Sequence, residues 1–374
     1  MRRERLRLLA AIAGVSFGVV LVFVQLGFQE ALFDSALTFH TSLGYDIAVI
    51  SPKTDTIIQA ESFPRTRVFQ ALGVDGVESV TPVYMANATW RNPTRSDESK
   101  TIFVFGVDPN DRAFEWDGVA SQLGKLRLPD RMLFDRASRP EYGPVPLLLD
   151  ESSQIATEVN GRQIEIVGLF EFGTSFGIDG SLLTSDLNFR RLFPDRPASH
   201  VDVGLIYLEQ GADPVQVRDA IASVLPRDVE VFSREEFIAR EFQYWNEGTP
   251  IGYVFSFGVI MGLVVGMVIV YQILFSDVQN SLREYATLKA MGYANSYLVG
   301  VVVRQSVLLG VFGYIPAFGV TWLLYEQAAA ATNLPLVMTT TRAVIVLALT
   351  LGMCCASATL AIRKLRSAQP AEIF

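Results

Sequence analysis

Residues 251–293 read IGYVFSFGVIMGLVVGMVIVYQILFSDVQNSLREYATLKAMGY, and the organisation of the whole chain can be worked out from this segment. Its first 25 residues, 251–275, carry no charge. A helix of about 20 residues, rising roughly 1.5 Å per residue, crosses a hydrocarbon core of about 30 Å. This run therefore predicts a membrane-spanning helix.

The residues after this run are more polar and predict a second, short helix. Most of its apolar side chains fall near one face, with Arg283 and Thr287 opposite, although Lys289 falls on the apolar side. Gly292 suits the C-terminal end of such a helix. A helix here can pass force to a protein outside the membrane, or the segment can be an ordinary loop on the membrane surface. The pattern alone allows both interpretations.

Four apolar blocks of the chain carry no charge, and each is long enough to cross a membrane. A single Asp, Lys or Arg in the middle of a span would cost about 2.5–3.5 kcal/mol, so the absence of charge is informative. The blocks are residues 8–28, 251–275, 306–325 and 343–362. The predicted fold is an α-helical membrane protein with four transmembrane helices and a large α/β extracytoplasmic domain inserted between the first and the second.

The charges are unevenly distributed and predict the orientation. Residues 29–250 carry 20 Lys and Arg against 34 Asp and Glu, whereas the rest of the chain carries 11 against 5. The positive residues outside that segment gather at the N-terminus, between the second and third spans, and at the C-terminus; positive loops stay in the cytoplasm. We therefore expect cytoplasmic termini and an exported acidic segment. That segment contains no cysteine, so it has no disulfide framework.

The exported segment alternates strand-like and helix-like stretches, which is typical of an α/β domain. The order strand, helix, strand is predicted twice, at 46–51, 64–72 and 77–84 and again at 201–208, 213–225 and 229–232. Asn160-Gly161 predicts a two-residue hairpin turn, and Ser233 with Glu236 predicts a capping box at the start of a stalk helix.

These patterns divide the chain into a membrane part and the exported part, 29–250. The predicted divisions are 1–28 (start and first span), 46–107 and 190–232 (two α/β halves), about 108–190 (an inserted subdomain), 233–247 (stalk helix), 251–275 (second span), 276–297 (coupling helix), 298–325 (third span), 326–342 (short outer loop), 343–362 (fourth span) and 363–374 (tail).

Glycines recur at four-residue spacing in the first two spans. They are Gly14 and Gly18 in the first, and Gly258, Gly262 and Gly266 in the second. Small residues at this spacing let two helices approach closely, so they predict a tight contact between the first and second spans, within one chain or across a dimer. The alternative is that glycine is simply common in membrane helices.

No catalytic or metal-binding motif is recognisable in the sequence. A P-loop is missing. His40 and His200 lack the spacing of metal ligands, and Cys354 and Cys355 have no base nearby in the sequence. Basic residues interleaved with aromatic ones, as in nucleic-acid binding, are absent as well. The sequence therefore does not indicate an enzyme, a metal site or a nucleic-acid partner.

Five segments point to a known family. They are LGFQEALFDSA (26–36), LFDRASRPE (133–141), LTSDLNF (183–189), EYATLKAMGY (284–293) and PAEIF (370–374). With the order of spans, they resemble the DevC-type permeases of the MacB/FtsX/LolC superfamily of ABC transporters, also called type VII. Relatives extend further before the first basic cluster than this sequence does, and no N-terminal elbow helix is predicted from it.

The resemblance implies a bacterial inner-membrane protein that works as a homodimer with its large domain in the periplasm. Its implied partners are a cytoplasmic DevA-type ATPase, which binds ATP and Mg²⁺, a DevB-type membrane-fusion adaptor, a TolC-like outer-membrane duct and the lipid membrane. This chain then needs no cofactor, and its cargo is glycolipid or other envelope material. The residues that would dock on the ATPase are Arg283, Glu284, Tyr285, Thr287, Leu288, Lys289, Met291 and Gly292.

Two other functions fit the same resemblance. One is an FtsX-like scaffold whose ATP-driven bending activates a cell-wall hydrolase. The other is lipoprotein release of the LolC/LolE kind, which uses a periplasmic carrier.

Overall fold

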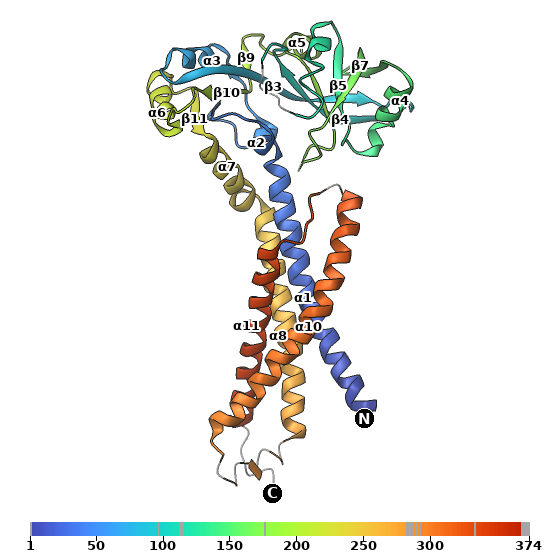
Figure 1. The fold of residues 1–374 in the computed structure, drawn as a ribbon, viewed down its shortest axis with the longest axis vertical. Helices are drawn as coiled ribbons and strands as arrows, with labels where there is room; N and C mark the ends of the chain where they lie inside the picture. Colours follow the sequence, from blue (N-terminus) through green and yellow to red (C-terminus); the bar gives the residue numbers. More distant parts are fainter. Residues whose placement is uncertain are drawn as a thin grey trace. The chain divides into compact units, whose positions relative to one another are not determined.

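The computed structural model divides the chain into two compact units. We call Met1–Ala31 with Thr249–Phe374 the membrane unit and Leu32–Gly248 the α/β unit. Figure 1 follows both along the sequence. The residues that the structure describes are 2–95, 97–111, 116–175, 177–281, 284, 287–288, 291, 293–332 and 334–367.

The described part of the membrane unit is built from four long helices (Figure 1). They are α1 (Arg2–Ala36), α8 (Pro250–Asn280), α10 (Asn295–Thr332) and α11 (Thr340–Ser367). Each is long and apolar enough to cross a membrane, with a mean hydropathy between 1.9 and 2.5 in its most apolar stretch. The prediction of four spans is confirmed. The helices run beyond the uncharged blocks, and in α1 the added N-terminal residues include arginines, which are good helix formers.

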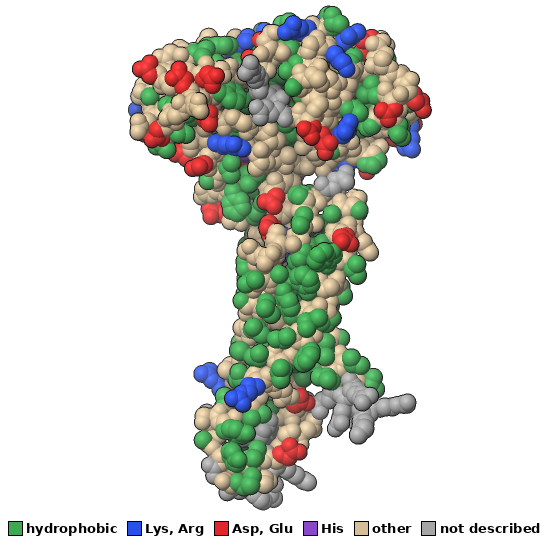
Figure 2. Space-filling model, viewed as in Figure 1, with side chains coloured by type: hydrophobic (Ala, Val, Ile, Leu, Met, Phe, Trp, Pro, Cys, Tyr) green, Lys and Arg blue, Asp and Glu red, His purple; other side chains and the backbone are tan. Residues whose placement is uncertain are grey.

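Apolar side chains lie on both the inner and the outer sides of these helices. Val19 and Phe23 of α1 pack in the same buried cluster as Val270 and Leu274 of α8. Figure 2 shows apolar side chains over most of the visible face of this unit. Exposed apolar residues of this unit include Phe257, Val264, Phe312, Ile315 and Leu323. Helices that are apolar all round are typical of a membrane bundle, whose outer surface meets lipid.

Within the described residues, the α/β unit contains one sheet of nine strands and a small two-stranded sheet (Figure 1). The spatial order of the large sheet is β11-β1-β10-β3-β4-β8-β5-β7-β6, and β2 pairs with β9. The strands are β1 (Ile47–Ile50), β2 (Phe63–Pro64), β3 (Val77–Arg91), β4 (Ser99–Val107), β5 (Arg131–Asp135), β6 (Ile155–Val159), β7 (Arg162–Phe170), β8 (Ser181–Ser185), β9 (His200–Val201), β10 (Val203–Leu208) and β11 (Glu230–Ser233).

The long strand β3 is shared by two parts of this sheet, one ending at β11 and the other at β6. Its first part, up to Val83, pairs with β10, and its second part, from Tyr84 to Arg91, pairs with β4. The sequence predicted a strand only as far as residue 84. The strand continues because Ala88 and Trp90 alternate with exposed neighbours and stay buried. The next strand, β4, pairs with β8 on its other edge. β4 and β8 fall on either side of the predicted boundary of the inserted subdomain.

Short helices lie against the faces and edges of the sheet. They are α2 (Thr38–Ser42), α3 (Thr66–Gln70), α4 (Val145–Glu151), α5 (Asp186–Leu192), α6 (Pro214–Val224) and α7 (Arg234–Gln243), followed by one π-helical turn at Tyr244–Gly248. Short 3₁₀ turns occur at Ile57–Gln59, Ala71–Gly73, Leu123–Arg127 and Pro140–Tyr142.

The strand β1 is buried on both faces of the sheet. Ile47 and Val49 of β1 point to one apolar cluster, and Ala48 and Ile50 point to another. Successive side chains of a strand face opposite sides, so alternate residues of the same strand fill two separate cores. This explains the unbroken apolar runs of β1 and β10, whereas β6 and the second part of β3 alternate buried and exposed residues.

Two local predictions are confirmed. Asn160 and Gly161 both adopt positive φ, 50° and 73°, in the tight turn between β6 and β7. Ser233 and Glu236 form the capping box at the start of α7, with reciprocal bonds between side chain and backbone. Short-range chemistry of this kind is readable because both partners lie within a few residues of each other.

Candidate functional site

The predicted coupling helix lies between α8 and α10, and the structure describes part of it. Glu284, Thr287 and Leu288 are helical, and the Met291 N–H donates to the Thr287 carbonyl at 3.0 Å. The Tyr293 N–H donates to the Leu288 carbonyl at 3.2 Å. The other predicted docking residues, Arg283, Tyr285, Lys289 and Gly292, lie outside the described residues.

The end of this segment presents apolar and aromatic surface to solvent. Met291 is 63% exposed and Tyr293 is 45% exposed. The rings of Tyr293 and Tyr297 lie 5.0 Å apart, centroid to centroid. Exposed apolar side chains such as these can dock in a groove of a partner protein, and burial of apolar side chains in a groove is one of the recurring modes of recognition.

The helices on either side of the segment are joined by a polar contact. Gln305 of α10 donates to the Asp277 carboxylate of α8 at 2.9 Å. A displacement of the segment between them would therefore act on both helices. No local pattern in the sequence relates the two residues, because they lie on different helices.

All five predicted packing glycines lie where α1 and α8 approach each other. A Cβ atom added to Gly18 would lie 2.9 Å from the Gly266 Cα, and one added to Gly14 would lie 2.6 Å from a methyl group of Ile269. Gly262 faces Val22 at 3.1 Å in the same way. These glycines therefore let α1 and α8 of one chain approach closely. A contact between two copies of the chain stays a prediction.

The fifth predicted glycine, Gly258, also faces α1. A Cβ atom there would collide with the side chain of Gln25. Gly266 also contacts α11. A Cβ atom added to Gly266 would overlap the Met353 sulfur.

The stalk helix α7 is held by a buried carboxylate that the sequence analysis missed. Glu241 is fully buried and accepts hydrogen bonds from the Thr56 hydroxyl, from the Ile57 N–H at 3.1 Å and from the Trp245 Nε1–H at 3.0 Å. Burial raises the pKa of Glu241 above its ordinary value, while these donors act in the opposite direction. The spacing of Glu241 and Trp245 by four residues was the available sequence signal.

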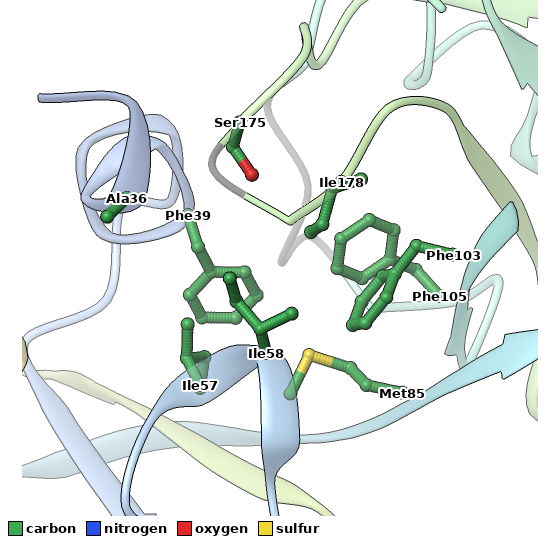
Figure 3. A pocket seen from close by; sticks show the side chains of 9 residues that line it. All are labelled: Ala36, Phe39, Ile57, Ile58, Met85, Phe103, Phe105, Ser175 and Ile178. Atoms are coloured by element: carbon green, nitrogen blue, oxygen red, sulfur yellow. The ribbon is translucent and has the colours of Figure 1, made fainter. Parts of the chain in front are cut away.

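A small apolar cavity lies in the α/β unit beside the last residue of α1. The side chains of Phe39, Ile58 and Met85 converge on it from one side and those of Phe103 and Phe105 from the other (Figure 3). Its volume is about 10 Å³, roughly the space that one water molecule needs. Ser175 supplies a hydroxyl to an otherwise apolar lining. In this conformation the cavity has no room for a lipid chain.

His40 and Cys354 are buried, and His200 and Cys355 are half-buried. The Tyr45 hydroxyl lies 2.8 Å from Nδ1 of His40 in the core, and burial together with Arg234 lowers the pKa of His40 to about 3. Cys354 is buried and Cys355 half-buried in α11. Among the described residues, no group of three or more His, Cys, Asp or Glu could hold a metal ion.

The fold defines a class of protein: a multi-pass membrane protein with a mixed α/β unit inserted between its first and second spans. Residues 8–224 match the family model of the MacB-like periplasmic core domain, and residues 256–370 match that of the FtsX-like permease C-terminal region. The first match alone covers more than half of the sequence. The chain therefore belongs to the MacB/FtsX-like permeases, which are inner-membrane components of ABC transporters and typically carry no enzymatic activity of their own.

Two solved structures are similar to part of the chain. The extracellular domain of the noncanonical ABC-type transporter YknZ from Gram-positive bacteria aligns with 50% of this chain and 98% of its own, at 14% identity and a TM-score of 0.34. The periplasmic region of MacB from Actinobacillus actinomycetemcomitans aligns with 51% of this chain and 90% of its own, at 8% identity and a TM-score of 0.36. No curated protein matches the chain.

Proposed function

We propose that this chain is the permease subunit of an ATP-driven exporter and that it carries motion from a separate ATPase to its α/β unit. Membership of the MacB/FtsX-like family supports the role of a permease subunit. The observation that carries the proposed coupling is the exposed apolar surface at Met291, next to the helical turn at Thr287 and Leu288.

In this proposal, residues 276–297 lie in the cytoplasm with both termini, and the α/β unit lies in the periplasm. The ATPase binds ATP and Mg²⁺, and docks on the segment through the side chains around Leu288 and Met291. ATP-driven movement of the docked ATPase displaces the segment. The displacement acts on α8 and α10 together, since the hydrogen bond between Asp277 and Gln305 joins these helices.

The finer parts of the proposal come from the resemblance to DevC-type permeases. The assembly contains a second copy of this chain, a DevA-type ATPase, a DevB-type membrane-fusion adaptor and a TolC-like outer-membrane duct. The cargo is glycolipid or other envelope material that enters from the periplasmic side. The close approach of α1 and α8 at Gly18 and Gly266 supports a rigid pair of spans that can move as one body.

The proposal is tested with the full-length chain in liposomes, alone and together with the candidate ATPase. We expect no ATP hydrolysis by the chain alone, and hydrolysis that rises when the ATPase is bound to it. Hydrolysis by the purified chain without a partner would overturn the proposal, and so would an ATPase that binds equally well to liposomes lacking the chain.

An alternative function is an FtsX-like scaffold, and the match of residues 256–370 to the FtsX-like permease region is compatible with it. A scaffold that activates a cell-wall hydrolase would bind that hydrolase through the α/β unit, whereas an exporter would bind the adaptor and the duct. Binding assays of the chain with the purified hydrolase, adaptor and duct distinguish the two functions. Binding of a periplasmic lipoprotein carrier instead would favour the LolC/LolE kind of function.

A further inference from the structure

Three helices of the membrane unit meet at one polar cluster, and we infer that this cluster transmits movement of α10 and α11 to α1. We call it the α1 clamp; it consists of Phe23, Gly27 and Glu30 of α1, Tyr325 of α10 and Arg342 of α11. The inference rests on the proposed function, since it concerns the route by which coupling reaches the α/β unit.

Arg342 is the centre of the clamp. It lies in the first turn of α11 and is only 4% exposed. Its Nε and Nη2 donate to one carboxylate oxygen of Glu30, at 3.0 and 2.6 Å, and its Nη1 donates to the Val337 carbonyl at 2.9 Å. All three guanidinium nitrogens therefore have a partner, and the charge is fixed to α1 in one geometry.

Tyr325 ties α10 to the same part of α1. Its side chain is 2% exposed, and its hydroxyl donates to the Phe23 carbonyl. The ring can come this close because position 27 is glycine: a Cβ atom there would overlap the Tyr325 ring. The guanidinium carbon of Arg342 lies 5.3 Å from the centroid of the same ring, within the range of a cation–π interaction. The three helices are thus joined through one set of mutual contacts.

The position of the clamp along the helices gives it a role beyond packing. Tyr325 lies 30 residues after Asn295, the first residue of α10, which corresponds to about 45 Å of helix at roughly 1.5 Å per residue. The clamp is therefore at the opposite end of α10 from the predicted coupling segment. On its other side, α1 continues only as far as Ala36, and the α/β unit begins at Leu32. The clamp lies on the route from the coupling segment through α10 and α1 to the α/β unit.

The chemistry of the clamp is not what packing alone requires. The Arg342 side chain is 4% exposed and that of Glu30 is 46% exposed, so only the arginine end of this ion pair is buried. Such a pair contributes little net stability, because the Coulomb gain is offset by the hydration that Arg342 loses, and its replacement by apolar residues of similar volume should cost little. Removal of Glu30 alone is costly, since it leaves the buried Arg342 charge unpaired. Replacement of both partners therefore separates the two roles. If the pair only fills space, its apolar replacement keeps coupling; if the pair holds α11 to α1 in one geometry, coupling is lost while the fold is kept.

The test uses the full chain with its ATPase in liposomes. Glu30→Leu and Arg342→Met are introduced together, in a chain that carries Cys354→Ala, Cys355→Ala and Thr41→Cys. Thr41 is exposed in α2, just after α1, and an environment-sensitive fluorophore on it reports movement at the start of the α/β unit. We expect the double variant to keep ATP hydrolysis and thermal stability but to lose the ATP-dependent fluorescence change.

A matched control is the pair Arg95→Met and Glu98→Leu. This ion pair is 3.1 Å long and lies on the exposed surface of the α/β unit, so its removal should leave both readouts unchanged. Tyr325→Phe is the second test variant, because it removes one hydroxyl and keeps the ring over which Arg342 lies. We expect it to reduce the ATP-dependent change without reducing hydrolysis.

The outcomes separate this inference from the proposed function. An ATP-dependent change of equal size in the double variant, in Tyr325→Phe and in the parent chain would overturn the inference and leave the proposed function standing. A parent complex that hydrolyses ATP without any fluorescence change would overturn the proposed transmission to the α/β unit, and the clamp with it.

Discussion

Replacement of Met291 by Asp tests the predicted ATPase contact most directly. Met291 is 63% exposed, so the change should not disturb the fold of the isolated chain. Complete burial of a Met side chain contributes about 1.5–3 kcal/mol, and burial of the exposed part in a partner groove about 1–2 kcal/mol. Loss of that contribution alone weakens binding roughly five- to thirty-fold, and the carboxylate would also have to lose its hydration in the groove.

The measurement is the affinity of the solubilised chain for the purified ATPase. Leu187→Asp is the matched control, since Leu187 is also 63% exposed but lies in α5 of the α/β unit. We expect Met291→Asp to weaken binding about tenfold or more and Leu187→Asp to leave it unchanged. Wild-type affinity and normal export in Met291→Asp would refute the reasoning and make the segment a linker. Leu288→Asp should uncouple as well, but Leu288 is half-buried and its replacement is less selective.

Three further predictions concern particular contacts. Gly18→Val should destabilise the membrane unit by about 1–3 kcal/mol, because its Cβ atom would lie 2.9 Å from the Gly266 Cα; thermal unfolding in detergent measures this, and an unchanged melting temperature would count against the close packing. The pKa of His40 is lowered from 6.5 to about 3, so its contribution to stability is present above pH 6.5 and is lost as the pH falls. Between pH 7.5 and pH 5.5 that loss is about 1.4 kcal/mol, and urea unfolding at both values should show a change in stability that is larger by about this amount in the wild type than in His40→Gln. Glu241→Leu should loosen the attachment of α7 and speed hydrogen exchange at Ile57, since three donors lose their acceptor, whereas Glu241→Gln should have a smaller effect.

The spans and several local features could be predicted from the sequence because their causes are local. An uncharged run such as 251–275 has one stable environment, since a charge within it would be costly in the membrane. Asn160-Gly161 allows the positive φ angles of a tight hairpin, and Ser233 and Glu236 are three residues apart, within reach of each other's backbone. In each case the energetic reason lies within one turn, one hairpin or one helix.

The contacts on which the coupling proposal depends could not be predicted in this way. The hydrogen bond from Thr56 to Glu241 joins residues 185 positions apart, and the ion pair of Arg342 with Glu30 joins residues 312 positions apart. The sequence contains many carboxylates and arginines, and no periodic pattern states which of them meet. The pairing of β4 with β8 could not be predicted either, because apolar strands with two buried faces can pair in several orders. Hydropathy determined the number of spans and the insertion of the α/β domain between the first two, since each residue contributes to hydropathy independently. The clamp, the stalk contact and the strand order depend on which distant residues fill the same space, and only the folded chain decides that.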